Sequence, residues 1–364
     1  MWALARPDAI KILNDKLAKK ALSRYFTVFQ NKKPAKFIIA KKIPANLDDI
    51  SDLNALWAQH KKLTDLYFSL EKEVDSNVVK IDQLETPQKN YLDLKTAIAN
   101  KILQNCHFCV RRCGVNRASG QLGYCQTGKD FQLSTAFTHL GEEPELVPSG
   151  TIFSIGCNLK CLHCQNWTIS QRYETGDIYT PQELAGVCEN LRAEGCRNIN
   201  MVGGSPTPHL HTWLDTFRHV KNSIATVWNS NSYYSEETAQ LLTGFVDVFL
   251  LDYKYGSNEC AKRISDAPNY VETCQRNHLL AKKYGELLIR ILILPEHLDC
   301  CLKPICEWIA KNLGPETRVN LLFQYTPHWR ADEIPELRRR LTSEEMRRSL
   351  EIAKDAGLVN LVRD

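Results

Sequence analysis

The sequence of 364 residues lacks any uninterrupted apolar run of about 18 residues, the length that a membrane-spanning helix requires. Its N-terminus lacks a basic segment followed by an apolar one, so no secretory signal is expected. A serine–histidine–aspartate triad, a phosphate-binding glycine loop and paired acid–base carboxylates are not evident either. These absences leave the cysteines as the main chemical signal.

The composition is that of an ordinary globular chain. Hydrophobic residues make up 43% and charged residues 24% of the sequence. The length is enough for one large α/β domain with an appendage. Three parts are expected: a helical N-terminal region at 1–100, a cysteine-rich metal-binding segment at 101–145, and a β/α domain with a C-terminal helix at 146–364.

Positive charge is concentrated near the N-terminus. Residues 1–45 contain eleven Lys or Arg against two Asp, which gives +9 there and −5 in the remainder of a chain whose net charge is +4. Such asymmetry can indicate a nucleic-acid or acidic-partner surface, but a solvated helix face is the favoured interpretation.

The fourteen cysteines are crowded into two short groups, with the others scattered. This distribution indicates metal ligands and reduced thiols, so a reducing compartment is expected, with the cytoplasm as the default.

The second of these groups is the more informative. Cys157, Cys161 and Cys164 occur in CNLKCLHC, directly after an apolar strand-like run. Three and two intervening residues let one loop offer a thiolate to each of three irons of a [4Fe–4S] cluster, leaving the fourth iron open for chemistry. The alternative is a zinc site that takes His163 as its fourth ligand, although zinc sites usually come as two matched pairs.

The upstream group provides four thiols in CHFCVRRCGVNRASGQLGYC: Cys106, Cys109, Cys113 and Cys125. They can close a second site for zinc, a single iron or an auxiliary cluster, and a set of buried thiols is the alternative. Seven further cysteines lack ligand spacing and are expected to be small buried apolar residues: Cys188, Cys196, Cys260, Cys274, Cys300, Cys301 and Cys306. His209 and His211 are expected to be surface residues near a helix start.

Strand and helix signals alternate after about residue 146. Continuous apolar runs predict strands at 151–156, 198–204, 226–232, 246–255, 286–295 and 318–325. Capping signals and apolar periodicity predict helices between them, at 181–194, 208–223, after Ser235, at 258–284 and 300–312, and a last helix before Gly357. Repeated β–α units of this kind predict a parallel sheet covered by helices, either a barrel or a doubly wound sheet.

Polar residues follow several of these strands, where sites gather in parallel β/α folds. They are Gly203, Gly204, Ser205, Asn229, Asn231, Asp252, Lys254, Arg290, Gln324 and Tyr325. Each has a structural alternative: a plain turn at the glycines, an Asp252–Lys254 pair, or an ion pair between Arg290 and a strand neighbour.

The cysteine loop, the glycine pair and the Asp-x-Lys strand end together resemble radical S-adenosylmethionine (SAM) enzymes of the pyruvate formate-lyase activating-enzyme type, in a branch with an extra upstream cysteine group. The resemblance covers residues 101–330. It implies a partial (β/α)6 barrel, a [4Fe–4S] cluster on Cys157, Cys161 and Cys164, and SAM bound by the strand-end residues. Ser205, where relatives have Glu, and Tyr253, where they have Leu, depart from the family pattern.

The resemblance further implies reductive cleavage of SAM to a 5′-deoxyadenosyl radical that takes hydrogen from a substrate carbon, with no catalytic side chain assigned beyond the cluster. A flavodoxin or ferredoxin would supply the electron, and the substrate would be a glycyl-radical protein. Modification of a peptide, a small molecule or, less favoured, RNA is the alternative within the same chemistry. A non-catalytic metal-binding interaction protein is the alternative from another class.

Overall fold

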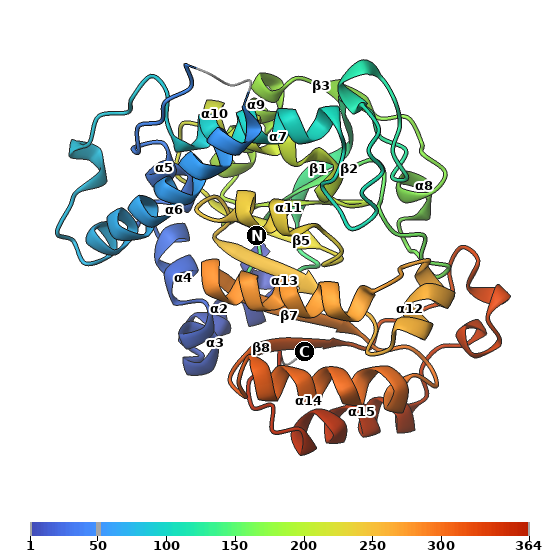
Figure 1. Cartoon of the computed structure of the whole chain (residues 1–364). Helices are drawn as coiled ribbons and strands as arrows, with labels where there is room; N and C mark the ends of the chain where they lie inside the picture. Colours follow the sequence, from blue (N-terminus) through green and yellow to red (C-terminus); the bar gives the residue numbers. More distant parts are fainter. Residues whose placement is uncertain (1, 49–51, 363–364) are drawn as a thin grey trace.

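The computed structural model describes residues 2–48 and 52–362 (Figure 1). Helices fill most of the N-terminal region, as the sequence predicts. They are α1 (Trp2–Ala5), α2 (Asp8–Lys11), α3 (Lys16–Ala21), α4 (Ser23–Phe29), α5 (Lys36–Ala40), α6 (Leu53–Asp75) and α7 (Tyr91–Gln104). Among the helices described, none combines the length and the apolar character that a bilayer crossing requires.

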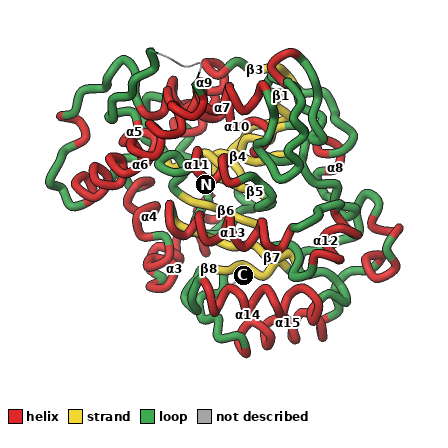
Figure 2. Tube along the Cα trace, in the orientation of Figure 1, coloured by secondary structure: helices red, strands yellow, loops and turns green. Residues whose placement is uncertain are grey.

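A single mixed sheet forms the centre of the molecule, in the strand order β3-β1-β2-β4-β5-β6-β7-β8 (Figure 2). Its parallel part comprises β2 (Ser149–Ser154), β4 (Asn198–Gly203), β5 (Ala225–Ser230), β6 (Val248–Asp252), β7 (Glu286–Leu292) and β8 (Arg318–Leu322). These six strands correspond to the six predicted from apolar runs. The prediction of six parallel β/α units is therefore confirmed.

Two strands extend the sheet beyond the predicted ones. β1 (Phe131–His139) pairs antiparallel with β2, and β3 (Asp177–Tyr179) pairs antiparallel with β1. The second half of β1, residues 135–139, is only partly buried, and β3 has three residues. Neither strand therefore has the continuous apolar run of the inner strands.

Helices follow the parallel strands: α8 (Trp167–Ser170), α9 (Pro181–Ala193), α10 (Leu210–His219), α11 (Glu236–Leu242), α12 (Asn258–Ser265), α13 (Tyr270–Tyr284), α14 (Lys303–Asn312) and α15 (Ser343–Asp355). Capping boxes at Thr180 and Thr342 begin α9 and α15. The helical segments predicted over 258–284 are two helices, α12 and α13. Asp266 and Asn269 both adopt positive φ angles on either side of Pro268, which ends α12 before α13 begins.

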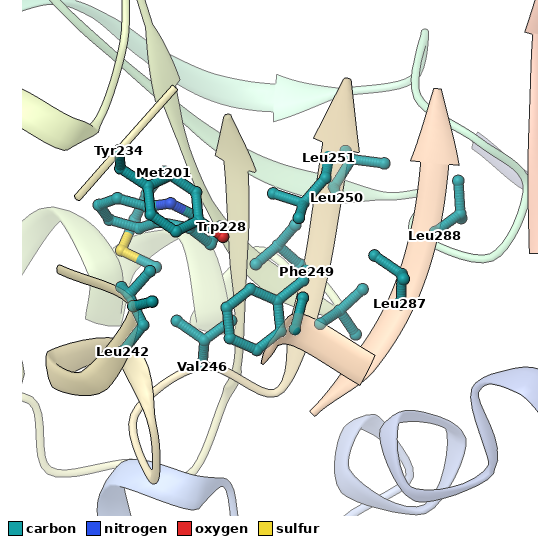
Figure 3. Close-up of a cluster of buried hydrophobic side chains, with 14 of the residues drawn as sticks. Met201, Trp228, Tyr234, Leu242, Val246, Phe249, Leu250, Leu251, Leu287 and Leu288 are labelled. Atoms are coloured by element: carbon teal, nitrogen blue, oxygen red, sulfur yellow. The ribbon is translucent and has the colours of Figure 1, made fainter. Parts of the chain in front are cut away.

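The inner strands are buried on both faces, as expected for a parallel sheet. Figure 3 shows Trp228 of β5, Phe249 and Leu250 of β6 and Leu288 of β7 within one apolar cluster. Each of these side chains is no more than 2% exposed. The cluster fixes the register of the strands whose ends carry the candidate site.

The N-terminal helices pack against the starting ends of the inner strands. Arg24 of α4 forms a salt bridge with Asp247, with 3.0 Å between Nη1 and Oδ1. The backbone N–H of Tyr25 donates to Glu286, which begins β7. Lys36 is buried and pairs with Glu71 of α6 at 2.6 Å. Part of the basic segment is therefore internal, and the expectation of a wholly solvated helix face is wrong for Arg24 and Lys36.

Candidate active site

A cavity of about 650 Å³ opens at the carboxyl ends of the parallel strands. Such a volume lies within the range of small-molecule sites. Of the candidates in the cysteine loop and at the strand ends, all except Ser205 and Tyr325 line it: Cys157, Cys161, Cys164, Gly203, Gly204, Asn229, Asn231, Asp252, Lys254, Arg290 and Gln324. The structure thus brings together residues from six different strand ends.

The cysteine loop begins at Gly156, which follows β2 and has a φ of +90°. The backbone N–H of Leu159 donates to the sulfur of Cys157 at 3.4 Å, and the hydroxyl of Ser170 lies 3.2 Å from the sulfur of Cys164. Burial raises the pKa of Cys157 to about 12 and that of Cys161 to about 11. These two thiols therefore stay protonated unless a bound cation holds them as thiolates.

The loop is held from outside by the end of α12. The N–H of Lys160 donates to the carbonyl of Ser265 at 3.0 Å, and that of Leu162 donates to the carbonyl of Ile264 at 2.9 Å. These backbone bonds fix the segment that presents Cys161.

His163 packs inside this loop. Its Nε2 lies 3.2 Å from the hydroxyl of Tyr255. Burial and then the charge of Lys254 lower the pKa of His163 to about 3, so its ring is neutral. This arrangement fits the predicted packing role of His163 and does not support His163 as the fourth ligand of a zinc ion.

The glycine pair after β4 has a packing role that sequence reasoning did not identify. A Cβ on Gly203 would lie 2.1 Å from the carbonyl oxygen of Ser154, and one on Gly204 would lie 2.2 Å from that of Gly156. Both residues must therefore lack a side chain for β4 to approach the start of the cysteine loop. The pair also lines the cavity, so backbone contact with a ligand remains a prediction.

Ser205 is the candidate that the structure separates from the others. It is 2% exposed, its hydroxyl accepts from the N–H of Thr207 at 3.4 Å, and it does not line the cavity. Contact between Ser205 and a cofactor stays a prediction without geometric support.

Two asparagines line the wall after β5. The Nδ2 of Asn231 donates to Oδ1 of Asn158 at 2.8 Å and lies 3.7 Å from the sulfur of Cys157. The Oδ1 of Asn229 lies 3.4 Å from Nη1 of Arg290. Asn231 therefore links this wall to the cysteine loop.

Asp252 and Lys254 form a pair on the cavity wall, with 2.8 Å between Oδ2 and Nζ. Burial by itself lowers the pKa of Lys254, but the charges of Asp252 and Cys161 raise it above its ordinary value. Lys254 is therefore a cation that faces the cysteine loop. The structure shows the pairing, and it places both groups where a ligand can also reach them.

Arg290 pairs with two carboxylates that sequence reasoning missed. It contacts Glu142, and its Nε and Nη2 each lie 2.6 Å from an oxygen of Glu143. Burial opposes the charge of Glu142, but Arg290 and His139 lower its pKa to about 2. The predicted ion pair exists, although its partners come from the turn after β1 rather than from a neighbouring strand. The acidic run EEPE at 142–145 was the available signal.

Gln324 lines the cavity, whereas Tyr325 points away and donates to the carbonyl of Leu337 at 2.7 Å. The prediction that both line the substrate space holds only for Gln324.

The four upstream cysteines, Cys106, Cys109, Cys113 and Cys125, line one small pocket. Arg117 is fully buried beside them, and its Nη1 lies 3.8 Å from the sulfur of Cys106. This segment contacts the start of the cysteine loop, because a Cβ on Gly156 would lie 2.2 Å from Thr127 and 2.8 Å from the carbonyl of Cys125.

Two expectations about other residues are wrong. His209 and His211 are buried, and their Nε2 atoms lie 2.8 Å from the carbonyls of Ile155 and Lys129, so they are not surface residues. Cys300 is exposed, and its sulfur lies 3.8 Å from that of Cys260. Cys188, Cys196, Cys274, Cys301 and Cys306 are buried, as expected.

Comparisons with known proteins match the part of the chain that contains the parallel strands and the cysteine loop. The model of the radical SAM superfamily matches residues 151–309. An uncharacterized protein of Methanocaldococcus jannaschii, MJ0674, is 46% identical over 343 residues, which cover 93% of this chain and 98% of the relative. A second one, MJ0808, is 28% identical over 262 residues, covering 65% and 74%. Residues 151–309 of this chain are therefore a radical SAM superfamily domain.

Solved structures were also matched. They include Streptococcus suis SuiB bound to S-adenosylmethionine, at 14% identity and a TM-score of 0.41, covering 55% of this chain and 44% of that one. SuiB bound to its precursor peptide SuiA gives 13% identity and a TM-score of 0.42, covering 56% and 46%. The chain thus spans less than half of these structures. The match to this domain confirms the predicted [4Fe–4S] cluster and SAM, because a radical SAM domain binds both.

Proposed function

We propose that Cys157, Cys161 and Cys164 hold the [4Fe–4S] cluster and that the enzyme removes a hydrogen atom from a carbon of its substrate. When bound, the cluster and SAM supply the 5′-deoxyadenosyl radical that performs this step. The observation that carries the proposal is the shared cavity: the three sulfurs and the polar ends of the following strands all face it. Fourteen free cysteines fit a reducing compartment such as the cytoplasm.

The residues of the wall have separate roles in this proposal. The backbone at Gly203 and Gly204 and the amides of Asn229 and Asn231 bind SAM, because they offer hydrogen-bond partners along the cavity. Asp252 and Lys254 also contact SAM, whose amino and carboxylate groups match their opposite charges.

Arg290 shapes the cavity wall rather than binding the carboxylate of SAM, because Glu142 and Glu143 already occupy its guanidinium. The upstream cysteines hold a second metal or cluster, which orders the segment that contacts Gly156.

We further propose that the substrate is a partner protein from which the enzyme takes an α-hydrogen of glycine, with electrons from a flavodoxin or ferredoxin. The support is the combination of the C-x3-C-x2-C loop, the glycine pair and the Asp-x-Lys strand end in one chain. This is the activating-enzyme role, and peptide, small-molecule or RNA modification would use the same site on another substrate.

Anaerobic reconstitution tests the chemistry. With dithionite and SAM, the protein is expected to form 5′-deoxyadenosine, and Cys161→Ala is expected to abolish this product. Cys188→Ala is the matched control, because Cys188 is also buried but lies on α9 outside the cavity. Equal product from the Cys161→Ala protein would contradict the ligand assignment. A wild-type protein that binds zinc alone and forms no product would favour the non-catalytic alternative.

Isotope transfer tests the substrate. The reconstituted enzyme is incubated with protein extract from source cells grown on α-deuterated glycine, and deuterium in 5′-deoxyadenosine is measured by mass spectrometry. We expect deuterium in 5′-deoxyadenosine, and we expect it to disappear when the proteins are removed from the extract. Product formation without deuterium, stimulated instead by the small-molecule or RNA fraction, would contradict the activating-enzyme role.

A further inference from the structure

We propose that Cys260, His297, Cys300 and Cys301 form a zinc site outside the cavity, which ties α12 to the turn before α14. The sulfurs of Cys260 and Cys300 and a ring nitrogen of His297 lie within 4.8 Å of one another. Cys301 is not part of this mutually close group, but it follows Cys300 directly and its sulfur lies 3.8 Å from that of Cys300. Three thiolates and one imidazole are a standard ligand set of structural zinc.

The sulfur separations fit one ion rather than a cluster. A tetrahedral zinc ion with Zn–S bonds of about 2.3 Å places its sulfurs about 3.8 Å apart. The Cys260–Cys300 and Cys300–Cys301 sulfur pairs are both separated by 3.8 Å. A [4Fe–4S] cluster binds each thiolate to a different iron and therefore holds them farther apart.

His297 is oriented as zinc-binding histidines are. It is 4% exposed, and its Nδ1 lies 2.8 Å from the carbonyl oxygen of Pro295. This bond places the ring proton on Nδ1 and leaves the electron pair on Nε2, the arrangement that supports metal ligation.

The guanidinium of Arg263 lies beside the proposed zinc ion. The Nη2 of Arg263 lies 3.4 Å from Nε2 of His297 and 2.5 Å from Glu336, whose Oε1 is 4.0 Å from the same nitrogen. Zinc with three thiolates carries a net charge of −1. The guanidinium of Arg263, which is already paired with Glu336 and faces Nε2, must turn aside to admit the ion and then lies next to that charge.

The backbone brings these ligands together across the fold. Cys300 and Cys301 lie in a π-helical turn, Leu298–Leu302, a rare conformation that occurs frequently at functional sites. A Cβ on Gly256 would lie 2.5 Å from the carbonyl oxygen of Cys301. Glycine at this position lets the loop after β6 lie directly on that turn, which sets Cys260 of α12 against it.

The site has a consequence for the cysteine loop. The last residues of α12, Ile264 and Ser265, accept the backbone hydrogen bonds of Leu162 and Lys160. An ion bound to Cys260 in the same helix fixes α12 and so supports the loop that presents Cys161. This consequence rests on the proposed function, whereas zinc binding itself does not.

Zinc content of the full-length, anaerobically purified protein tests the site. Because the upstream cysteines are a second candidate for zinc, the count is read as a difference. Cys300→Ser and Cys260→Ser are each expected to lower the zinc content by one ion per chain. Cys306→Ser, a buried cysteine of α14 outside the group, is expected to leave it unchanged. Cys300 is exposed, so its serine variant removes a ligand without opening the core.

Zinc affinity and the oxidation state of Cys260 and Cys300 are two further tests of the proposed site. Competition with a chromophoric zinc chelator is expected to show at least about a 100-fold loss of affinity at this site in Cys300→Ser, since outer-shell changes alone cost up to that much. Zinc content and affinity identical in wild type, Cys260→Ser and Cys300→Ser would overturn the proposal. So would a Cys260–Cys300 disulfide, found by mass spectrometry in the anaerobically purified protein. Neither result depends on the cluster or on 5′-deoxyadenosine formation.

Discussion

Lys254 forms a salt bridge with Asp252 on the wall of the cavity, with 2.8 Å between Nζ and Oδ2. Both side chains are less than one quarter exposed. The two opposite charges therefore compensate each other in a partly buried place, and both side chains remain within reach of a ligand.

Lys254→Met is expected to lower the free energy of unfolding by about 3 kcal/mol, because it leaves the carboxylate of Asp252 partly buried without a partner. The double variant Asp252→Asn/Lys254→Met is expected to recover part of this loss. Chemical denaturation measures both effects. Lys262→Met is the matched control: Lys262 pairs with Asp266 at the surface, where the loss is expected to stay below about 1 kcal/mol. Equal losses at both lysines would contradict this account.

Gly204→Ala is expected to displace the cysteine loop, because its Cβ would lie 2.2 Å from the carbonyl oxygen of Gly156. The expected result is a substoichiometric iron content after reconstitution and a lower melting temperature. Gly186→Ala serves as the control, since Gly186 lies within α9 and a Cβ there meets nothing within 4 Å. That variant is expected to be more stable by about 0.5–1 kcal/mol. Full iron loading of Gly204→Ala would show that the loop tolerates the contact.

Arg290→Gln is expected to act on stability rather than on SAM affinity. It leaves Glu142 and Glu143, which are 6% and 4% exposed, without their cation, at an expected loss of about 3–5 kcal/mol. Unfolding measurements and SAM binding on the same sample separate the two effects. Arg347→Gln, at an exposed pair on α15, is the control. Unchanged stability with a large loss of SAM affinity would show that Arg290 binds the cofactor instead.

His278 on α13 gives a pH-dependent prediction away from the metal sites. Burial lowers its pKa to about 4. Between about pH 4 and 6.5 the imidazole is therefore neutral in the native state but protonated in the unfolded state. The unfolded state then binds more protons, and stability falls as the pH falls through this window. Relative to His278→Leu, wild type is expected to lose about 1.4 kcal/mol per pH unit between pH 6.5 and 4. Parallel pH profiles would contradict the prediction.

The parallel strands could be predicted because each is a continuous apolar run that is buried on both faces. β1 was missed because most of its residues are only partly buried, which weakens the apolar pattern. The division between α12 and α13 depends on two residues with positive φ that helix periodicity does not reveal.

The candidate site was largely predictable because parallel strands bring their carboxyl ends to one edge. Cys157, Cys161, Cys164, Asp252 and Lys254 line one cavity for that reason. Contacts between distant segments were not predictable. Cys260 and Cys300 are forty residues apart, so their spacing carried no ligand signal, and the partners of Arg290 come from a turn almost 150 residues upstream.

The central claim is that Cys157, Cys161 and Cys164 hold a cluster with one iron open to SAM. Electron paramagnetic resonance of the dithionite-reduced protein, with and without SAM, tests it most directly. A [4Fe–4S] signal that changes shape when SAM is added is predicted for wild type and Cys188→Ala, and no such signal is predicted for Cys161→Ala. A reduced cluster whose signal is unaffected by SAM, or survives in Cys161→Ala, would contradict the assignment.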